Sequence, residues 1–334
     1  MKEFFIDHPS DVLNLPLKFK GKNTLWGVAP IAPIHLGYDS LILLQKKAIE
    51  EGSNHIVLLA DLHAMMSHGL KWEDVNTRAY YWKFYLKEIC QIEAVYLYGS
   101  YFQTRPEYVE DLYSIISNIT VRKVKDSVPK VAKTEAFYVY QTVYPIMQCL
   151  DIFHTDTEII LAEEGQRKIY KLVRELYKSE IFRPWVNQRL RKKLSFIYIH
   201  TSHDINGEPL IKSKLSTRIN IHETPTTLKK KINKMYAPPA GQRLEQGRIN
   251  ALLEFFKFSV FPWCGEVRIK TSKGEKYYAS YSEFEDDYTK GEIHPADAKE
   301  ALYNCLSERL RKIQELLTQG LTKWIDFSKL KKEL

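Results

Sequence analysis

Residues 34–40 of the chain, IHLGYDS, combine residue types that could bind the phosphates of a nucleotide. They lie between an apolar run and a segment with helical periodicity. The free N–H groups and the dipole of a helix N-terminus attract phosphate at such a place. Gly37 would let a nucleotide approach the backbone, and His35 could donate a hydrogen bond to a phosphate oxygen. A helix cap beside a histidine explains the same residues, so both interpretations stay open for this segment alone.

Further runs place polar side chains where a ligand could meet them. Asp61 and His63, in LLADLHA, come at the end of a β-rich run. Tyr144, Gln148 and Asp151 are spaced i, i+4 and i+7 in a helical pattern and therefore share one helix face. The run GQRK opens the next helical pattern after another β-rich run. A core helix and a hydrogen-bonded histidine explain each of these features when it is taken singly.

Five short β-rich runs recur along the first 200 residues, with helical patterns between them. They are residues 24–29, 55–61, 94–100, 157–162 and 195–200. Their nearly continuous apolar character is typical of strands that are buried on both faces of a parallel sheet. The alternation predicts a doubly wound α/β domain, in which ligands bind outside the carboxyl ends of the strands.

The character of the chain changes after about residue 225. The later segments are mostly helical and are interrupted by one β-like patch at 266–281. A Pro/Gly-rich connection, YAPPAGQ, occupies residues 236–242. A chain of 334 residues is long enough for one large and one smaller domain. We therefore expect a smaller, mostly helical C-terminal domain.

Composition narrows the class of protein. The chain is 44% hydrophobic and carries a net charge of +8, which is concentrated between residues 183 and 248. Such a basic zone attracts a polyanion such as nucleic acid, although a solvated lysine-rich surface explains it as well. The four scattered cysteines form no Cys-x-x-Cys pair and suit a reducing cytoplasm. No apolar run approaches the ~18 residues of a membrane span, and the charged N-terminal run does not suit a signal peptide.

The runs LLADLHA, YPIMQCLD, GQRK and EIHPADAK, in this order and spacing, resemble those of the archaeal and eukaryotic tyrosyl-tRNA synthetases. These are class I aminoacyl-tRNA synthetases, and the resemblance covers roughly residues 20–318. It implies that L-tyrosine attacks the α-phosphate of ATP to give tyrosyl-adenylate, from which tyrosine passes to the 3′ end of tRNA(Tyr). It also implies a cytoplasmic homodimer without a membrane segment. Mg²⁺ would bind with ATP, and no protein-bound metal is expected.

The resemblance implies a division of the chain at residue 225. Residues 1–225 would form a Rossmann-like catalytic domain, and residues 226–334 a helical anticodon-binding domain. The first would contain an inserted connective segment, about 101–140, and a linker with the ATP loop, about 201–225.

The residues that would bind ATP come from two segments. They are His35, Gly37, Tyr38, Lys212, Ser213 and Lys214. His35 and the two lysines would be catalytic, because they stabilise charge that develops on the phosphates. Tyr38 stands where the family signature, His-Ile-Gly-His, ends in histidine. The loop has two registers, since a gapless match selects residues 209–213 and a shifted match selects 214–217.

The resemblance also assigns residues to tyrosine and to tRNA. The tyrosine-binding residues would be Gly27, Leu58, His63, Tyr144, Gln148, Asp151 and Gln166. Asp151 would accept the phenol O–H, a type of contact known from tyrosyl-tRNA synthetase to reject phenylalanine about 10⁵-fold. The tRNA-binding residues would be Arg167 and Lys168 at the acceptor stem, and His294, Pro295 and Asp297 at the anticodon.

Several positions depart from the family pattern. Leu25 stands where the family has a second phenol-binding residue, a tyrosine. Ala162 and Glu163 replace a pair of glycines, and Ser272 stands near the place of an aromatic that stacks on the anticodon. These departures motivate an alternative, a synthetase paralogue that binds RNA or an aromatic ligand without aminoacylation.

A further alternative comes from another run of the sequence, HTSHD. His200, His203 and Asp204 are residue types that ligate a metal, as in a metal-dependent hydrolase. A strand end before a loop explains the same residues.

Overall fold

The computed structural model describes residues 1–31, 33–128, 138–178, 194–210, 214–271 and 274–321. The chain forms two compact units. Unit 1 comprises residues 1–31 and 41–200, and unit 2 comprises residues 32–40 and 201–334.

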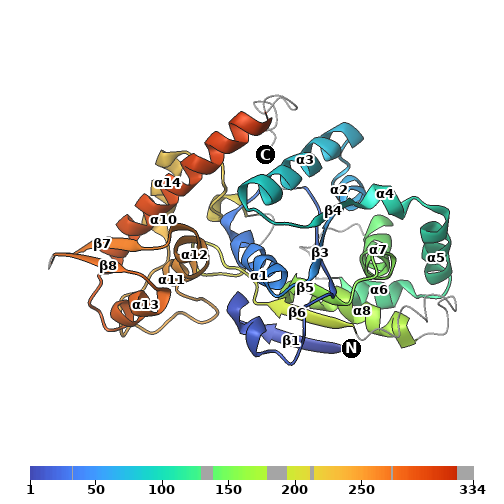
Figure 1. The fold of residues 1–334 in the computed structure, drawn as a ribbon, viewed down its shortest axis with the longest axis horizontal. Coiled ribbons are helices and arrows are strands. Elements are labelled where there is room, and N and C mark those ends of the chain that lie inside the picture. The colour runs from blue at the N-terminus through green and yellow to red at the C-terminus, as the bar shows by residue number, and fades with distance from the viewer. Residues whose placement is uncertain (32, 129–137, 179–193, 211–213, 272–273, 322–334) are drawn as a thin grey trace. The chain divides into compact units, whose positions relative to one another are not determined.

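A six-stranded sheet forms the centre of unit 1, and all of its strand pairs are parallel (Figure 1). The strand order is β1-β6-β5-β2-β3-β4. The strands are β1 (Lys2–Ile6), β2 (Asn23–Val28), β3 (Asn54–Leu59), β4 (Val95–Tyr98), β5 (Ile159–Glu163) and β6 (Ser195–Ile199). The chain proceeds outward from β2 through β3 to β4 and places β5 on the other side of β2. The topological switch point, where such sheets bind ligands, therefore lies between β2 and β5.

The predicted doubly wound parallel sheet is confirmed, with one strand more than predicted. The five expected strands lie within about two residues of their predicted ends. The sequence analysis missed β1, whose residues pair in register with β6 from Lys2↔Ser195 to Ile6↔Ile199. Only Ile6 of this strand is fully buried, because β1 is an edge strand. Its sequence therefore lacks the continuous apolar run by which the other strands were found.

Helices follow the strands of unit 1, as the alternating pattern predicted. They are α1 (Asp39–Glu50, whose first two residues belong to unit 2), α2 (Asp61–His68), α3 (Trp72–Phe84), α4 (Gly99–Gln103), α5 (Pro106–Ile116), α6 (Val121–Ser127), α7 (Tyr140–His154) and α8 (Arg167–Lys178). α7 packs against α5, α6 and α8. Leu150, Ile152 and Tyr170 join the buried cluster that also contains Leu25 and Phe196 of the sheet. This packing directs one face of α7 toward the core.

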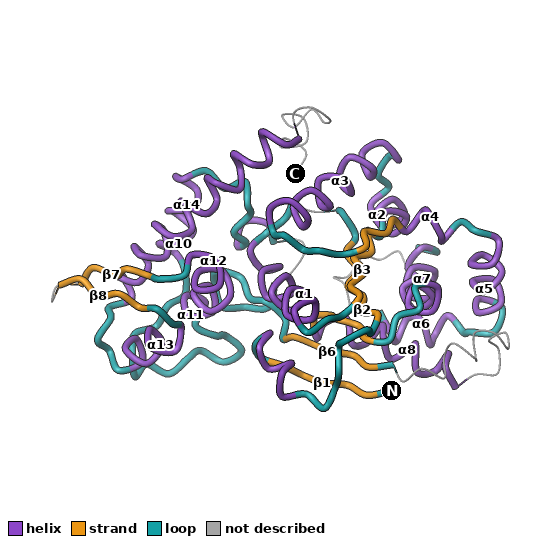
Figure 2. The backbone as a smooth tube through the Cα atoms, in the orientation of Figure 1, coloured by secondary structure: helices purple, strands orange, loops and turns teal. Residues whose placement is uncertain are grey.

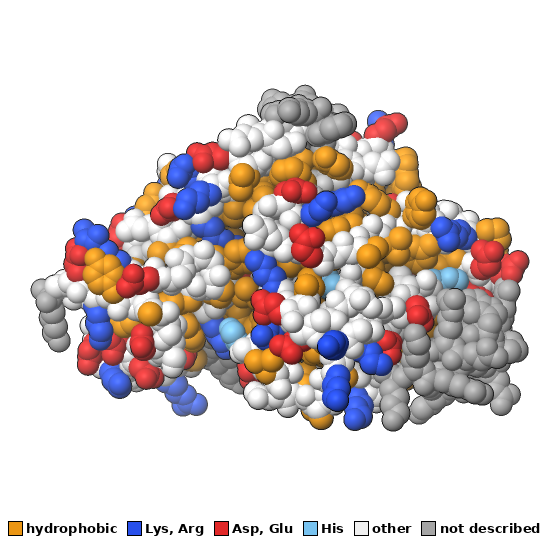
Figure 3. Space-filling model, viewed as in Figure 1, with side chains coloured by type: hydrophobic (Ala, Val, Ile, Leu, Met, Phe, Trp, Pro, Cys, Tyr) orange, Lys and Arg blue, Asp and Glu red, His pale blue; other side chains and the backbone are white. Residues whose placement is uncertain are grey.

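Unit 2 is mostly helical, as predicted (Figure 2). Its helices are α10 (Pro225–Lys234), α11 (Ala251–Phe255), α12 (Phe261–Cys264), α13 (Tyr281–Thr289) and α14 (Pro295–Leu321), with a π-helical turn at Phe256–Val260. The β-like patch forms an antiparallel pair, β7 (Val267–Thr271) and β8 (Gly274–Tyr278). Over these strands and α13, Figure 3 shows basic and acidic side chains interspersed. Arg268 pairs with Glu275, and Lys276 with Asp287.

The two compact units divide the chain between residues 200 and 201, and the functional domain boundary expected at residue 225 stays a prediction. Unit 2 already begins at Thr201, because the loop after β6 bonds to later parts of unit 2. Tyr236 donates its N–H to the carbonyl of Ile205, and Ile249 donates to the carbonyl of Gly207. Residues 32–40 join the same unit through backbone hydrogen bonds to Ile219 and Ile221. Among the helices that the structure describes, none is both long and apolar enough to cross a membrane.

Candidate active site

Two neighbouring strands of unit 1 carry the first predicted tyrosine-binding residues. Gly27 of β2 and Leu58 of β3 are direct partners in the parallel register. A Cβ atom at position 27 would lie 3.8 Å from the Cβ and Cδ2 atoms of Leu58, which is an ordinary contact. Gly27 is exposed, although β2 lies in the interior of the sheet. The glycine thus leaves open space beside Leu58 near the carboxyl ends of the strands.

The carboxylate of Asp151 is a deeply buried polar group of this region. Its residue is 1% exposed and lies on the core side of α7. The Oδ1 atom accepts a hydrogen bond of 2.7 Å from Gln103 Nε2 and another of 2.9 Å from the hydroxyl of Tyr108. The Oδ2 atom accepts no hydrogen bond from the residues that the structure describes. One oxygen is therefore held by the protein, and the other can accept from a ligand.

Burial also sets the protonation of Asp151. Desolvation raises the pKa of this carboxyl group to about 7, against the lowering effect of the bonds from Gln103 and Tyr108. The charge of Asp61 raises the pKa further. Asp61 is itself fully buried and accepts from the N–H and the hydroxyl of Ser100, at 2.8 and 2.6 Å. Asp151 is thus a buried acceptor that loses its charge close to neutral pH.

Sequence analysis missed both donors to Asp151. Gln103 ends α4, in the run YGSYFQ that follows β4, and Tyr108 lies in the first turn of α5. Tyr108 is fully buried and donates a second hydrogen bond, of 3.1 Å, to the carbonyl of Met147. The two donors lie 48 and 43 residues before Asp151 along the chain. Periodicity within a helix could not reveal such a pairing, although the polar residues after β4 were a usable signal.

His63 and Tyr144, two more predicted residues, are in contact. His63 Nε2 lies 3.3 Å from the carbonyl oxygen of Tyr144. The two rings pack edge to face, with a centroid distance of 6.4 Å. Burial lowers the pKa of His63 to about 4, so the ring is neutral at pH 7. Its Nδ1 atom is buried and has no hydrogen-bond partner among the described residues. A neutral imidazole with an unused nitrogen can orient a ligand without adding charge.

The predicted residues Gln148 and Gln166 also come together. The amide nitrogen of Gln148, on α7, donates a hydrogen bond of 3.3 Å to the amide oxygen of Gln166. Gln166 lies in a single 3-10 turn between β5 and α8, at the carboxyl end of β5. Both side chains are partly buried, and the pair leaves further donors and acceptors for a ligand. Unit 1 therefore carries all seven of the predicted tyrosine-binding residues, and six of them lie in three contacting pairs.

The predicted ATP signature lies in unit 2. His35 precedes a 3-10 turn over Leu36–Tyr38, and its ring stacks on Tyr38 with a centroid distance of 4.3 Å. The N–H of Leu36 donates a hydrogen bond to the carbonyl of Ile219, and the hydroxyl of Ser202 donates one of 2.7 Å to the carbonyl of Gly37. These bonds hold the signature against the loop that follows β6.

Gly37 packs closely against two side chains. A Cβ atom at this position would come within 2.4 Å of Leu210 Cδ1 and 2.9 Å of His35 Nδ1. Leu210 belongs to the 209–213 register of the predicted ATP loop, in which Lys212 and Ser213 lie outside the described residues. Lys214 is exposed, and its ammonium lies 3.5 Å from Glu208. The unit thus joins the signature to the segment that leads into the loop.

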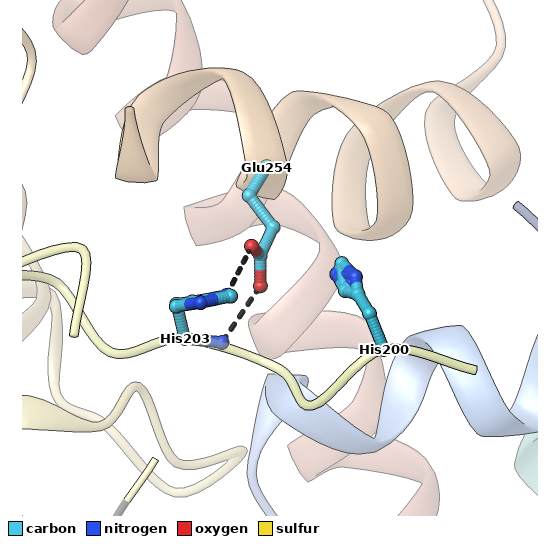
Figure 4. Close-up of side chains that lie close together, drawn as sticks. All are labelled: His200, His203 and Glu254. Atoms are coloured by element: carbon cyan, nitrogen blue, oxygen red, sulfur yellow. Dashed lines mark hydrogen bonds and ion pairs between the residues drawn. The ribbon is translucent and has the colours of Figure 1, made fainter. Parts of the chain in front are cut away.

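The residues of the HTSHD run do not assemble as the metal-site alternative predicted. His203 donates its N–H to Glu254 Oε1 at 2.8 Å, and its Nδ1 atom lies 2.8 Å from Glu254 Oε2 (Figure 4). Asp204 instead accepts the N–H groups of Asn206 and Glu208 within its own turn. His200 closes unit 1, whereas His203 belongs to unit 2. Glu254, on α11, is therefore the carboxylate that meets His203, and Asp204 organises a loop.

The predicted acceptor-stem residues differ in their surroundings. Arg167 pairs with Glu3 of β1, with an Nη2–Oε2 distance of 3.0 Å, and lies 4.9 Å over the ring of Phe5. Lys168 is exposed and has no ion-pair partner among the described residues. Glu3 also pairs with Arg174 of α8 at 3.0 Å. The edge strand β1, missed by the sequence analysis, thus holds one of the two basic side chains.

The predicted anticodon residues mark the start of the longest helix. His294 precedes α14, Pro295 is its first residue, and Asp297 lies in its first turn. His294 Nδ1 accepts the N–H of Ala296 at 3.2 Å, as a helix cap does. The carboxylate of Asp297 is half-buried and has no hydrogen-bond or ion-pair partner among the described residues. It can therefore accept hydrogen bonds from a ligand.

The positions that depart from the family pattern pack as ordinary parts of the sheet. Leu25 is buried beside Leu58 in the core cluster, and Ala162 is buried in β5. Glu163, which ends β5, is half-buried. Ser272 lies outside the described residues. Leu25 thus adds an apolar side chain to the core from the strand that carries Gly27.

The fold and this constellation define a class I aminoacyl-tRNA synthetase: the family model "tRNA synthetases class I (W and Y)" matches residues 21–311, and the chain belongs to that family. Within it, the tyrosine–tRNA ligase of Methanopyrus kandleri is 30% identical over 303 residues, which cover 87% of this chain and 88% of that relative. The tyrosine–tRNA ligase of Archaeoglobus fulgidus is 30% identical over 297 residues, with 86% and 87% covered.

Solved structures agree with this placement. The tyrosyl-tRNA synthetase of A. fulgidus complexed with L-tyrosine matches with a TM-score of 0.77 and 26% identity, over 92% of this chain and 94% of that one. The tryptophanyl-tRNA synthetase of Aeropyrum pernix, at 12% identity and a TM-score of 0.65, shares the fold.

Proposed function

We propose that this protein is a tyrosine–tRNA ligase, which activates L-tyrosine with ATP and transfers it to tRNA(Tyr). The observation that carries the proposal is the buried carboxylate of Asp151, one oxygen of which has no donor among the residues that the structure describes. A buried acceptor of this kind favours a ligand that ends in a hydroxyl group, because a ligand without one leaves the acceptor unpaired. Phenylalanine differs from tyrosine in that one group.

The other polar groups of unit 1 suit the backbone of an amino acid. Tyr144, Gln148 and Gln166 would bind the ammonium group, since their oxygen atoms can accept hydrogen bonds. His63 is neutral at pH 7 because burial lowers its pKa to about 4, so it does not repel this ammonium. The carboxylate of tyrosine would then attack the α-phosphate of ATP, a step that depends on positioning and on stabilisation of charge.

ATP would bind along the signature in unit 2. The phosphates would approach the backbone at Gly37, and His35 would donate to them, with Tyr38 beside it. Lys212, Ser213 and Lys214 would stabilise the charge of the departing pyrophosphate. Mg²⁺ would arrive with the phosphates of ATP, and we propose no metal held by protein side chains alone.

Two basic residues and one acidic residue would bind tRNA. Lys168 and Arg167 would contact the phosphates of the acceptor stem, where positive charge displaces counterions. Asp297, with His294 and Pro295 beside it, would accept hydrogen bonds from a splayed anticodon base. This contact would be made in the cytoplasm, where tRNA charging serves translation.

The apolar surface of unit 1 suits a homodimer. Tyr101 of α4 is 70% exposed, and Tyr113 and Ile116 of α5 are 63% and 39% exposed. Val95 of the edge strand β4 is 64% exposed. Aromatic and apolar groups exposed on neighbouring elements are typical of an interface with a second copy. Sedimentation would show twice the monomer mass, and Tyr101→Glu would shift it toward the monomer.

The exchange of pyrophosphate into ATP tests the activation step. The purified protein is mixed with Mg²⁺, ATP, labelled pyrophosphate and one of tyrosine, phenylalanine or tryptophan. We expect exchange with tyrosine and much slower exchange with the other two. Exchange with none of them, from a folded protein, would contradict the proposal and favour a paralogue that binds RNA or an aromatic ligand without activating it. Transfer of labelled tyrosine to tRNA(Tyr) then tests the second step.

A further inference from the structure

An ion pair within unit 2 joins the residue after the ATP signature to the middle of α14. Arg309 Nη1 lies 2.7 Å from Asp39 Oδ2, and Nη2 lies 2.8 Å from Oδ1. Asp39 is fully buried, and Arg309 is 8% exposed. A two-pronged contact between a guanidinium and a carboxylate fixes the orientation of both groups more strongly than a single hydrogen bond does.

The surroundings of Arg309 keep its guanidinium in one place. Nη1 also donates a hydrogen bond of 2.9 Å to the carbonyl of Ser259, which lies in the π-helical turn. Its Cζ atom lies 4.2 Å over the ring of Trp263 in α12. Two elements of unit 2, the π-helical turn and α12, therefore orient the guanidinium of Arg309 where it contacts Asp39. Removal of one partner of such a buried ion pair strongly destabilises the folded protein, because the other charge is left buried and unpaired.

Asp39 transmits this orientation to the signature. It is the first residue of α1 and directly follows Tyr38, so its position determines where the 3-10 turn over Leu36–Tyr38 ends. The turn is also tied at Leu36, whose N–H donates to Ile219, and at Gly37, whose carbonyl accepts from Ser202. The Asp39 carboxylate adds a charged contact at the end of the turn that enters α1.

We propose that Arg309 is a positioning residue for ATP: through Asp39 it holds the His35–Tyr38 segment in the conformation that binds the nucleotide. This inference rests on the proposed function, in which that segment binds ATP. It also connects the nucleotide segment with the helix that carries Asp297. Asp297 and Arg309 are twelve positions apart on α14, a distance of roughly 18 Å along the helix axis.

Variants of the pair separate ATP binding from tyrosine binding. The test measures the KM for ATP and the KM for tyrosine in pyrophosphate exchange for Arg309→Gln, Arg309→Lys and Asp39→Asn. We expect the KM for ATP to rise by about tenfold to a hundredfold in Arg309→Gln, since small displacements of binding groups have effects of this size. The KM for tyrosine should stay within about twofold, because its residues lie in unit 1. Arg309→Lys keeps the positive charge but cannot make the two-pronged contact. Its KM for ATP should therefore lie between those of the wild type and Arg309→Gln.

A matched control and a second variant keep a folding defect apart from a positioning role. Arg311→Gln removes a guanidinium two residues along α14 that is 60% exposed and pairs with Glu315, so both KM values should stay unchanged. The double variant Asp39→Asn/Arg309→Gln leaves no unpaired buried charge. Thermal unfolding identifies which variants are folded. The double variant should still show the raised KM for ATP.

Two results would overturn the inference. One is a folded double variant with a wild-type KM for ATP, and the other is an equal rise of both KM values. Titration calorimetry with a non-hydrolysable ATP analogue measures the affinity for the nucleotide in the absence of tyrosine. If the wild type shows no exchange, the proposed function fails, but binding of the analogue still tests the role of Arg309. Weaker binding by the folded double variant than by the wild type supports that role. Equal binding by the two proteins, or no binding by the wild type, refutes it.

Discussion

The hydroxyl group of Tyr108 donates a hydrogen bond of 2.9 Å to the Oδ1 atom of Asp151. Tyr108 reaches this carboxylate from α5, whereas position 25 of β2, where the resemblance implied a second phenol-binding tyrosine, holds a leucine. Gln103 donates to the same oxygen at 2.7 Å. The described residues therefore supply donors to one oxygen of the carboxylate, and the other oxygen can accept from a ligand.

Loss of the Asp151 carboxylate should abolish the choice between tyrosine and phenylalanine. In Asp151→Ala the phenol hydroxyl gains no acceptor, so the kcat/KM for tyrosine should fall by roughly two orders of magnitude or more, while that for phenylalanine changes less. Pyrophosphate exchange with each amino acid measures both values.

Asp111→Asn provides a matched control for a buried carboxylate. Asp111 is 3% exposed and lies 3.1 Å from His154 Nε2, so its loss also perturbs a buried pair. The ratio of the kcat/KM values for tyrosine and phenylalanine in Asp111→Asn should stay close to that of the wild type. Retained discrimination in a folded Asp151→Ala protein would refute the phenol-binding role.

Removal of the Tyr108 hydroxyl should shift the pH dependence of tyrosine activation to higher pH. Burial raises the pKa of Asp151 to about 7, and the bond from Tyr108 opposes that rise. Tyr108→Phe removes an opposing contact, so the pKa should increase. Because the ionised carboxylate is the better acceptor, the kcat/KM for tyrosine should fall as pH drops through about 7 in the wild type, and at a higher pH in the variant.

The measurement is the kcat/KM for tyrosine between pH 6 and 9, which reports groups of the free enzyme. Tyr113→Phe is the control, since Tyr113 lies on the same helix and is 63% exposed. Its profile should match the wild type. Superimposable profiles for wild type and Tyr108→Phe would show that this hydroxyl does not tune Asp151.

Asp297→Asn should weaken tRNA charging and leave tyrosine activation intact. The carboxylate lies in the first turn of α14 and has no partner among the described residues, so a base donor would meet an open acceptor. Loss of one such contact should reduce the kcat/KM for tRNA(Tyr) by about tenfold or more, corresponding to roughly 1–3 kcal/mol.

The control for Asp297 is Glu300→Gln, on the same helix, whose carboxylate pairs with Lys229 instead. It should charge tRNA as the wild type does. A tRNA(Tyr) transcript with a changed first anticodon base should narrow the difference between wild type and Asp297→Asn. Equal charging of the normal transcript by both proteins would remove Asp297 from the anticodon site.

Lys168→Ala should weaken tRNA binding more than Arg167→Ala does. Lys168 is exposed without an ion-pair partner among the described residues, whereas Arg167 is held by Glu3. The slope of log K against log salt should fall by about 0.7–0.9 in Lys168→Ala, which corresponds to one lost phosphate contact. Filter binding at several salt concentrations measures it, and Glu3→Gln should release Arg167 and strengthen binding. An unchanged slope in Lys168→Ala would rule out the phosphate contact.

The sequence by itself determined the local features of this protein. Four of the five predicted strands, β2, β3, β5 and β6, lie in the interior of the sheet, and they were predictable because residues buried on both faces of a sheet form continuous apolar runs. The face that carries Tyr144, Gln148 and Asp151 followed from the helical repeat. The order of the four quoted runs indicated the family, and the comparisons bear this out.

Only the tertiary structure decided which distant residues meet. Tyr108 reaches Asp151, Glu3 holds Arg167 and Arg309 holds Asp39 across separations of 43, 164 and 270 residues. Such contacts depend on how whole elements pack, and no repeat along the chain encodes them. The edge strand β1 was hidden for a related reason, since a strand with one neighbour needs no continuous apolar run. The sequence therefore specified which residue types could do the chemistry, and packing specified which partners orient them.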